Sequence, residues 1–244
     1  MLRRGLAMLV LALLGAFAHA HEAPTPAVIH LASEDWEDYS AADGHGLAWD
    51  LLRKVFEPAG VKLDIRTVPY TRSIGLVQLK EVDAMVGSYR DEAEQVVYPH
   101  WNFDTDHIHA LGLSSNPAPT LTTLSKYRLA WVRGYRYENY LPNIKRFNQI
   151  QRRSGILSML KQGRADFYID ALSEIEVVMR TAPDPLQYRA THLAELPVFL
   201  GFADTPQARS LMALFDRRMA QLVKSGELRP IFEKWKQPYP FDAN

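Results

Sequence analysis

The sequence contains no cysteine, and this absence removes several kinds of chemistry at once. A chain without thiols forms no disulfide, offers no thiolate to a metal ion and has no cysteine nucleophile. Its fold must therefore be stabilised by a hydrophobic core. With 244 residues, 47% of them hydrophobic, the chain is long and apolar enough to form one.

The sequence also lacks an excess of positive charge. It has 28 basic and 28 acidic residues and no cluster of basic ones. Nucleic acids and anionic membrane surfaces are bound through such clusters, so we expect neither partner. A phosphate-binding loop, a dinucleotide-binding fingerprint and a Gly-x-Ser-x-Gly motif are absent as well. We therefore expect no cofactor.

Long apolar runs are limited to one segment at the N-terminus. Arg3 and Arg4 precede an apolar stretch from Leu6 to Leu14, and Ala18-His19-Ala20 has the small-x-small pattern of a cleavage site. The run is too short to be a comfortable membrane span. We therefore predict a cleaved signal peptide at residues 1–20 and an exported product.

The rest of the chain alternates between short apolar strands and amphipathic helices. In its first part the hydrophobic periodicity predicts strands at 28–32, 61–66 and 84–86 and helices at 47–56 and 73–80. This order, with short connections, is typical of a parallel sheet covered by helices.

The same order returns further along the chain. We predict a strand at 127–132, a helix that ends at Gly163, a strand at 165–170, a return strand at 196–203 and closing helices at 207–224 and 227–236. The segment Asn116-Pro117-Ala118-Pro119 is a stiff, turn-rich connection, which we expect to be the crossover. The prediction is an α/β fold of two lobes, each a mainly parallel sheet flanked by helices. Lobe 1 comprises residues 21–113 with 203–244, and lobe 2 comprises residues 114–202.

Polar and aromatic residues follow the carboxyl ends of the predicted strands. Ligands of open α/β sheets bind at those ends, so the two lobes should share one cleft. The candidate site residues are Trp36, Tyr70, Arg72, Ser88 and Arg90 in lobe 1 and Gly134, Tyr135 and Asp170 in lobe 2.

Three features occur in a characteristic order. They are Gly46-Leu47-Ala48-Trp49-Asp50-Leu51-Leu52, the two helix-to-strand units that contain Val82-Asp83-Ala84-Met85 and Ala165-Asp166-Phe167-Tyr168, and the segment from Lys224 to Trp235. Together they resemble the family 3 periplasmic solute-binding proteins, the type II receptors of ABC uptake systems. The resemblance covers essentially the whole chain after residue 20. It implies the two-lobed periplasmic-binding-protein fold and a location in the periplasm.

The resemblance also implies roles for the candidate site residues. In that family an arginine after the lobe 1 strand binds the ligand carboxylate, an acidic residue at the end of the lobe 2 strand binds the ammonium, and aromatic rings form the walls. Arg72 or Arg90 would then take the anion and Asp170 an ammonium or hydroxyl group, because a guanidinium forks onto a carboxylate. The usual arginine position falls near Glu92. The ring walls would be Trp36, Tyr70 and Tyr135, with the Gly134 N–H as a further donor.

The implied function is a periplasmic receptor without catalytic residues. It would bind a small polar molecule, an amino acid or a related small carboxylate, and deliver it as a monomer to an ABC permease in the inner membrane. One alternative is an enzyme on the same fold, similar to periplasmic cyclohexadienyl dehydratases, with Glu34 or Glu92 as the general acid. Another is a metal-dependent binding module, since His107 and His109 would share one face of a strand. Alternation alone produces such pairs, so we predict no metal site.

Overall fold

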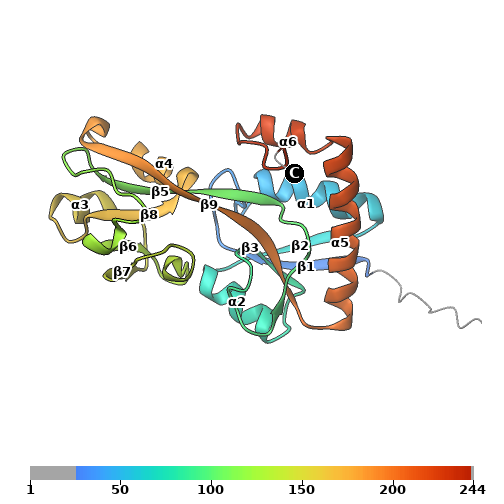
Figure 1. The fold of residues 1–244 in the computed structure, drawn as a ribbon. Coiled ribbons are helices and arrows are strands. Elements are labelled where there is room, and N and C mark those ends of the chain that lie inside the picture. The colour runs from blue at the N-terminus through green and yellow to red at the C-terminus, as the bar shows by residue number, and fades with distance from the viewer. Residues whose placement is uncertain (1–25, 243–244) are drawn as a thin grey trace, which may run out of the picture.

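The computed structural model describes residues 26–242, which form two lobes joined by two long strands (Figure 1). The signal peptide predicted at residues 1–20 lies outside the described residues. Within residues 26–242, no helix combines the length and the apolar character that a membrane span requires.

The first lobe is built on three parallel strands. Strand β1 (Val28–Ser33) pairs in parallel with β2 (Lys62–Thr67) on one side and β3 (Ala84–Ser88) on the other. Four helices pack around this sheet: α1 (Leu47–Phe56), α2 (Tyr70–Gln78), α5 (Pro206–Ser225) and α6 (Arg229–Lys234). The apolar side chains of α1 recur at helical spacing and are buried, which fixes its packing face.

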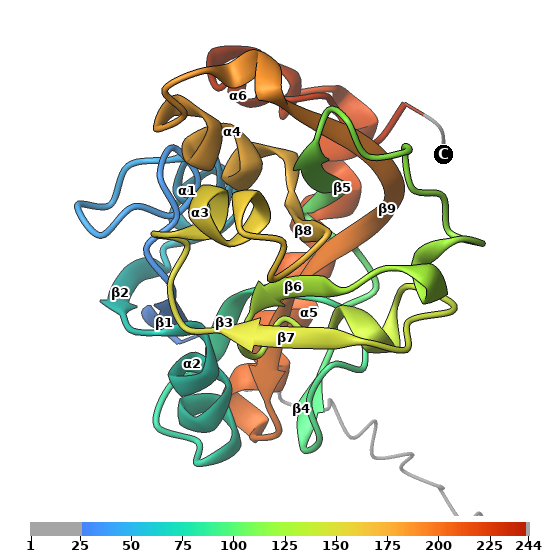
Figure 2. The same ribbon diagram turned by 90° about the vertical axis from the view of Figure 1, so that its left-hand side faces the viewer.

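The second lobe repeats this plan on a smaller scale. Strand β6 (Leu129–Val132) pairs in parallel with β7 (Phe147–Ile150) and β8 (Phe167–Ala171). Figure 2 shows β6 and β7 side by side, with α3 (Ile156–Lys161) and α4 (Leu172–Arg180) above them. Short 3-10 turns complete the two lobes at Glu57–Ala59, Leu124–Lys126, Tyr137–Asn139 and Pro185–Gln187.

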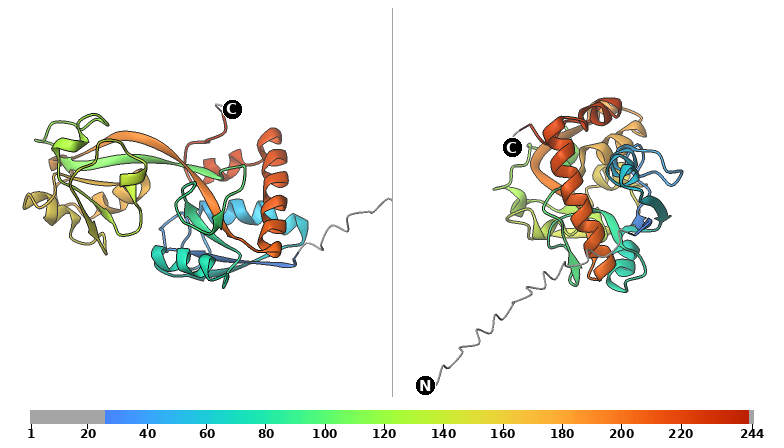
Figure 3. Two further views of the ribbon diagram at one scale, coloured as in Figure 1. Left: turned by 60° about the horizontal axis from the view of Figure 1, so that its bottom comes forward. Right: turned by 90° about the vertical axis from the view of Figure 1, so that its right-hand side faces the viewer.

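Two antiparallel strands connect the lobes. Strand β5 (Asp104–Leu113) and strand β9 (Tyr188–Ala203) pair along their lengths, and both run from one lobe into the other (Figures 1 and 3). The strand order is β2-β1-β3-β9-β5-β8-β6-β7, with the short β4 (Val96–Val97) also paired to β9. We refer to β5 and β9 together as the hinge strands.

The α/β fold of two lobes is confirmed, but several predicted boundaries are wrong. Helix α2 begins at Tyr70 rather than at Ser73, because Pro69 supplies the extended residue that precedes it. Strand β9 begins at Tyr188, well before the predicted start. The prediction missed its first half because that half is largely exposed and lacks an apolar pattern. The edge strand β7 was missed for the same reason.

The predicted crossover is also misplaced. The segment Asn116–Pro119 comes after the end of β5, which already pairs with β8 of the second lobe from Ile108 onward. The chain therefore crosses between the lobes within β5. The predicted limits of the lobes at residues 113 and 203 stay predictions, since β5 and β9 continue without a break through both sheets.

Candidate functional site

A small cavity lies between the two lobes, at the carboxyl ends of the parallel strands. It encloses about 50 Å³, which is room for only a few water molecules. A larger ligand can enter only when the lobes part. The residues that line it fall into two main groups: the rings of Trp36, Tyr39, Tyr70, Tyr89, Tyr135 and Tyr137, and the carboxyl groups of Glu92, Asp106, Asp170 and Glu174. Within residues 26–242, no arginine or lysine is among the lining residues.

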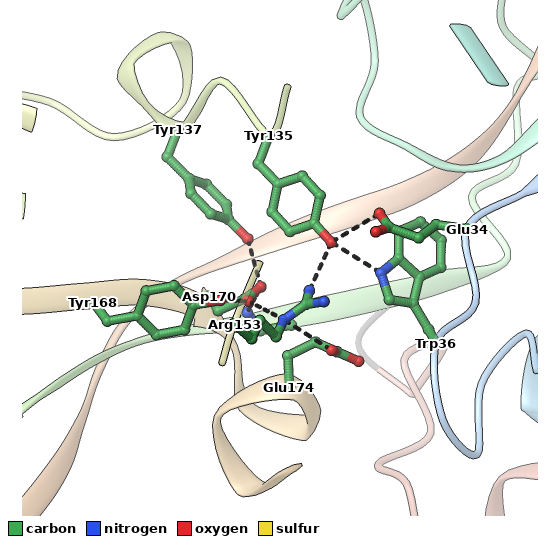
Figure 4. A network of polar contacts seen from close by, with 9 residues as sticks. Glu34, Trp36, Tyr135, Tyr137, Arg153, Tyr168, Asp170 and Glu174 are labelled. Carbon is green, nitrogen blue, oxygen red and sulfur yellow. Dashed lines mark hydrogen bonds and ion pairs between the residues drawn. The ribbon is translucent and has the colours of Figure 1, made fainter. Parts of the chain in front are cut away.

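Direct contacts hold the lobes together over this cavity. Trp36 Nε1 donates a hydrogen bond of 2.9 Å to the hydroxyl of Tyr135, across the cleft (Figure 4). Arg136 donates to the backbone carbonyl of Glu92 at 3.0 Å, and Arg180 forms a 2.9 Å ion pair with Glu37. The structure therefore shows the closed arrangement of the lobes.

Gly134 is required by this closed arrangement. Its φ of +99° lies in the region that favours glycine, and a Cβ there would lie 2.6 Å from Thr71 Cγ2 of the other lobe. Any larger residue at this position would push the lobes apart. The predicted role of its backbone N–H as a ligand donor stays a prediction.

The carboxyl group of Glu92 is buried at the lobe 1 side of the cavity, with 3% of the residue exposed. Its Oε2 atom accepts three hydrogen bonds, from Tyr70 OH at 2.5 Å, Ser88 Oγ at 3.0 Å and Tyr89 N–H at 3.0 Å. Its Oε1 atom is buried without a hydrogen-bond partner among the described residues. Burial raises the pKa of Glu92 to about 7, although the three donors act in the opposite direction.

Arg153 lies between two carboxyl groups at the lobe 2 side (Figure 4). Its Nε is 3.0 Å from Asp170 Oδ2 and 3.1 Å from Glu174 Oε2, and its other end donates to Tyr135 OH at 2.7 Å. Asp170 also accepts hydrogen bonds from Tyr168 OH and from the N–H of Ala171. Burial alone would lower the pKa of Arg153, but Asp170, Tyr135 and Glu174 outweigh it and hold that pKa above its usual value.

Several other carboxyl groups near the cavity resist ionisation. Burial raises the pKa of Asp106 to about 6, even though Tyr89 OH donates to it at 2.8 Å. Burial also raises the pKa of Glu34 and of Glu174, against the opposing effect of Arg153. A cationic group bound at this place would stabilise the ionised form of these carboxyl groups and so act against the rise in their pKa.

The structure brings together four of the eight predicted site residues. Trp36, Tyr70, Tyr135 and Asp170 all line the cavity. Ser88 lies behind them, fully buried, and supports the carboxyl group of Glu92.

Neither Arg72 nor Arg90 lines the cavity. Because α2 begins at Tyr70, Arg72 falls in its first turn with a half-exposed side chain 3.8 Å from Glu81. Arg90 donates to the carbonyl of Pro99 at 2.7 Å and stacks over the ring of Phe199. The ligand-anion role predicted for these two arginines stays a prediction, and the structure engages both guanidinium groups elsewhere.

Other residues of the site carry little signal in the sequence. Arg153 follows two polar residues between β7 and α3 and belongs to no hydrophobic pattern. Glu174 is on the first turn of α4 and resembles an ordinary helix-start acid. Asp106 stood out only as part of the histidine-containing segment. One signal was available for Glu92, since an acid stands near the position where the family resemblance implies an arginine.

Of the comparisons with known proteins, the one with solved structures supports the two-lobed α/β fold. No family model matches the sequence, and no curated protein matches it either. Among solved structures, EhuB in complex with hydroxyectoine is 21% identical, with a TM-score of 0.70 over 87% of this chain and 89% of that one. An ABC uptake transporter substrate binding protein from Streptococcus pneumoniae, with bound histidine, is 16% identical with a TM-score of 0.67, over 86% and 92%.

A third structure is the ancestral amino acid-binding protein AncCDT-1, described as a precursor of cyclohexadienyl dehydratase. It is 16% identical, with a TM-score of 0.64 over 86% of this chain and 95% of that one. At these identities the likeness establishes the fold. The chain has the two-lobed periplasmic-binding-protein fold of amino-acid receptors of ABC transporters.

Proposed function

We propose that this protein is a periplasmic receptor for a small organic solute that carries a positively charged group, and that it delivers this solute to an ABC permease. The observation that carries the proposal is Glu92 Oε1, a buried carboxyl oxygen without a hydrogen-bond partner among the described residues, on a residue that lines the cavity. A buried polar atom of this kind is costly unless it is satisfied. A ligand ammonium or similar donor would satisfy it.

The other lining residues support a cationic ligand. Aromatic faces attract cations, and six aromatic rings surround the cavity. The carboxyl groups of Asp106, Asp170 and Glu174 add negative potential, and Arg153 is already paired with two of them. Amino acids fit this site through their ammonium group. A small carboxylate without a cationic group finds no free cation in the described lining.

Closure of the lobes provides the receptor mechanism. The cavity is formed by residues from both lobes, so a ligand that contacts Glu92 and Asp170 at once favours the closed state. Binding proteins of this architecture close about a hinge, and the hinge strands β5 and β9 are the parts that would bend. A permease would then recognise the closed form.

The experiment that tests this proposal is thermal unfolding of the purified protein with a panel of ligands. The panel includes choline, spermidine, arginine, histidine, hydroxyectoine and succinate, together with 3,3-dimethylbutanol, which has the shape of choline without its charge. A ligand at 100 times its Kd stabilises the native state by about 2.7 kcal/mol. This corresponds to a rise in melting temperature of roughly 5–10 °C for a chain of this size.

We expect at least one cationic compound to raise the melting temperature and succinate and 3,3-dimethylbutanol to leave it unchanged. Equal shifts with choline and its neutral counterpart, or a shift with succinate alone, would contradict the assignment of a cationic ligand. The receptor role itself would survive the second result, because succinate would then be the ligand class.

A dehydratase is the second candidate function, and Glu92 is the observation that favours it. With a pKa of about 7, its carboxyl group is partly protonated at neutral pH and could act as a general acid. AncCDT-1, a protein of the same fold, is described as a precursor of such an enzyme. Prephenate, however, carries two carboxylates, and the described lining offers them no unpaired cation.

We therefore expect no turnover of prephenate or arogenate above the uncatalysed rate. The measurement is product formation by absorbance and chromatography, with heat-denatured protein as the control. Turnover that disappears in the Glu92→Gln variant would establish the enzyme and overturn the pure receptor function.

A further inference from the structure

A second cluster of polar side chains lies on the hinge strands, outside the residues that line the cavity. His107 of β5 and His192 and Glu195 of β9 each offer one donor atom, and these atoms lie within 4.8 Å of one another. His107 Nδ1 is 3.4 Å from Glu195 Oε1. That separation is long for a hydrogen bond. It matches the spacing of roughly 3.3 Å between neighbouring ligands of a tetrahedral zinc ion with bonds of about 2.0–2.1 Å.

A β-bulge brings these side chains to one face of the hinge strands. His107 lies opposite Glu195, but His109 lies opposite His192, so that Leu193 is an additional residue on β9. Residues directly opposite one another in an antiparallel pair share a face, and one additional residue reverses the alternation beyond it. Without the bulge, His192 and Glu195 would point to opposite faces.

A third imidazole stands beside this cluster. The ring of His109 is 5.1 Å from the ring of His192, and its Nδ1 is 2.8 Å from the backbone carbonyl of His107. When Nδ1–H donates to that carbonyl, Nε2 is left as the basic nitrogen. A metal-binding histidine is usually fixed in this way, but His109 is not among the residues whose donor atoms lie within 4.8 Å of one another, so that it borders the cluster.

The cluster is separate from the ligand cavity and open to solvent. Asp106, the residue before His107, lines the cavity, and successive side chains of a strand point to opposite faces. His107 therefore lies on the face opposite to that of Asp106, and none of His107, His192 and Glu195 is among the residues that line the cavity. Its side chain is 28% exposed and that of Glu195 is 61% exposed, so an ion from solution can reach both.

We propose that His107, His192 and Glu195 bind a divalent transition metal ion, with Zn²⁺ as the best match, on the face of the hinge strands away from Asp106. Two imidazoles and one carboxylate form a common zinc donor set, and water would complete the coordination. Calcium and magnesium prefer sites made entirely of oxygen ligands. A metal ion held here would join β5 to β9 at the bulge.

The test is isothermal titration of the purified protein, without a histidine tag, with ZnCl₂ in a buffer that does not chelate metals. We expect one saturable Zn²⁺ site per chain and no site for Ca²⁺ or Mg²⁺. His192→Gln and Glu195→Gln should each weaken Zn²⁺ binding by at least about 10- to 100-fold, the loss seen when even the supporting residues of a metal site are changed. His45→Gln, an exposed histidine of the first lobe, is the matched control.

A second measurement separates loss of the site from loss of the fold. The melting temperatures of the three variants without metal should equal that of the unchanged protein. Zn²⁺ should also slow amide hydrogen exchange around Ile108 and Leu193 in the unchanged protein but not in His192→Gln. Failure of Zn²⁺ to bind in a saturable one-to-one manner, or equal binding by His192→Gln, Glu195→Gln and the unchanged protein, would overturn the proposal.

Discussion

Replacement of Arg153 by methionine is expected to lower the free energy of unfolding by about 3–5 kcal/mol at pH 8, the usual cost of removing one partner from a buried ion pair. The Arg153 side chain is 18% exposed, that of Asp170 1% and that of Glu174 10%, so water cannot take over the lost contacts. Methionine keeps much of the length of arginine and leaves two buried carboxyl groups without their cation. For a chain of this size the melting temperature should fall on the order of 10 °C.

The destabilisation should depend on pH in a defined direction. Burial raises the pKa of Glu174 in the folded state, and without Arg153 the charge that opposes this rise is gone. Stability then falls as pH rises through the interval between the unfolded and folded pKa values. The cost of Arg153→Met should therefore be large at pH 8 and smaller at pH 5, as measured by urea unfolding at both values.

Two further variants make this prediction specific. Arg152→Met removes the neighbouring exposed arginine and should change stability by less than about 0.5 kcal/mol. Adding Asp170→Asn and Glu174→Gln to Arg153→Met removes the unpaired charges and should restore much of the stability. A loss below about 1 kcal/mol in Arg153→Met at pH 8 would show that the ion pair behaves as an exposed one.

Replacement of Glu92 by glutamine is expected to have opposite effects on ligand binding and on stability. A cationic ligand identified by the thermal-unfolding panel should bind by about 2–5 kcal/mol less tightly, the cost of removing one partner from a buried charge pair. Glutamine is nearly isosteric with glutamate, so its carbonyl oxygen can still accept from Tyr70, Ser88 and Tyr89. The measurement is titration calorimetry at pH 8.

The stability of the same variant should exceed that of the unchanged protein at alkaline pH. The folded-state pKa of Glu92 is raised from 4.5 to about 7, so the folded protein retains a proton that the unfolded chain releases. Between these pH values the unchanged protein loses stability as pH rises, by about 3 kcal/mol in all. Glutamine cannot ionise, and its variant should lack this loss.

Glu94→Gln is the matched control for Glu92→Gln. Glu94 is exposed two residues further along the chain, and its replacement should leave both ligand affinity and the pH dependence of unfolding unchanged. Weakened binding together with increased stability is the mark of a residue retained for function. If Glu92→Gln bound the ligand as tightly as the unchanged protein, Glu92 would not be the partner of the cation.

The sequence allowed the fold and part of the site to be predicted, each for a physical reason. Helix α1 and strand β2 show clear periodicities, and the rule that ligands lie at strand ends led directly to Trp36, Tyr135 and Asp170. Strand β7 carries mostly exposed residues at the edge of the sheet, where no hydrophobic pattern is imposed. Such an edge strand forms because it pairs with a neighbouring strand, here β6, and its own sequence does not predict it.

The charged residues of the site, Arg153 and Glu92, were harder to predict from the sequence. Arg153 reaches Asp170 only because β7 and α3 bring a patternless segment next to the end of β8. An acid near the position of the family arginine was visible in the sequence as Glu92. Its burial and its unpaired oxygen depend on α2 and on the loop after β3, which no local pattern specifies.

The place of β9 in the sheet has a consequence for how the chain folds. This strand is the last in the sequence, yet it lies between β3 and β5 in the strand order. Until residues 188–203 have been synthesised, β3 and β5 each expose an unpaired edge, and neither lobe has its complete sheet. Pairing between such distant parts of a chain is slow. In the exported receptor proposed above, this delay would leave the chain without its complete sheets until the central strand has followed.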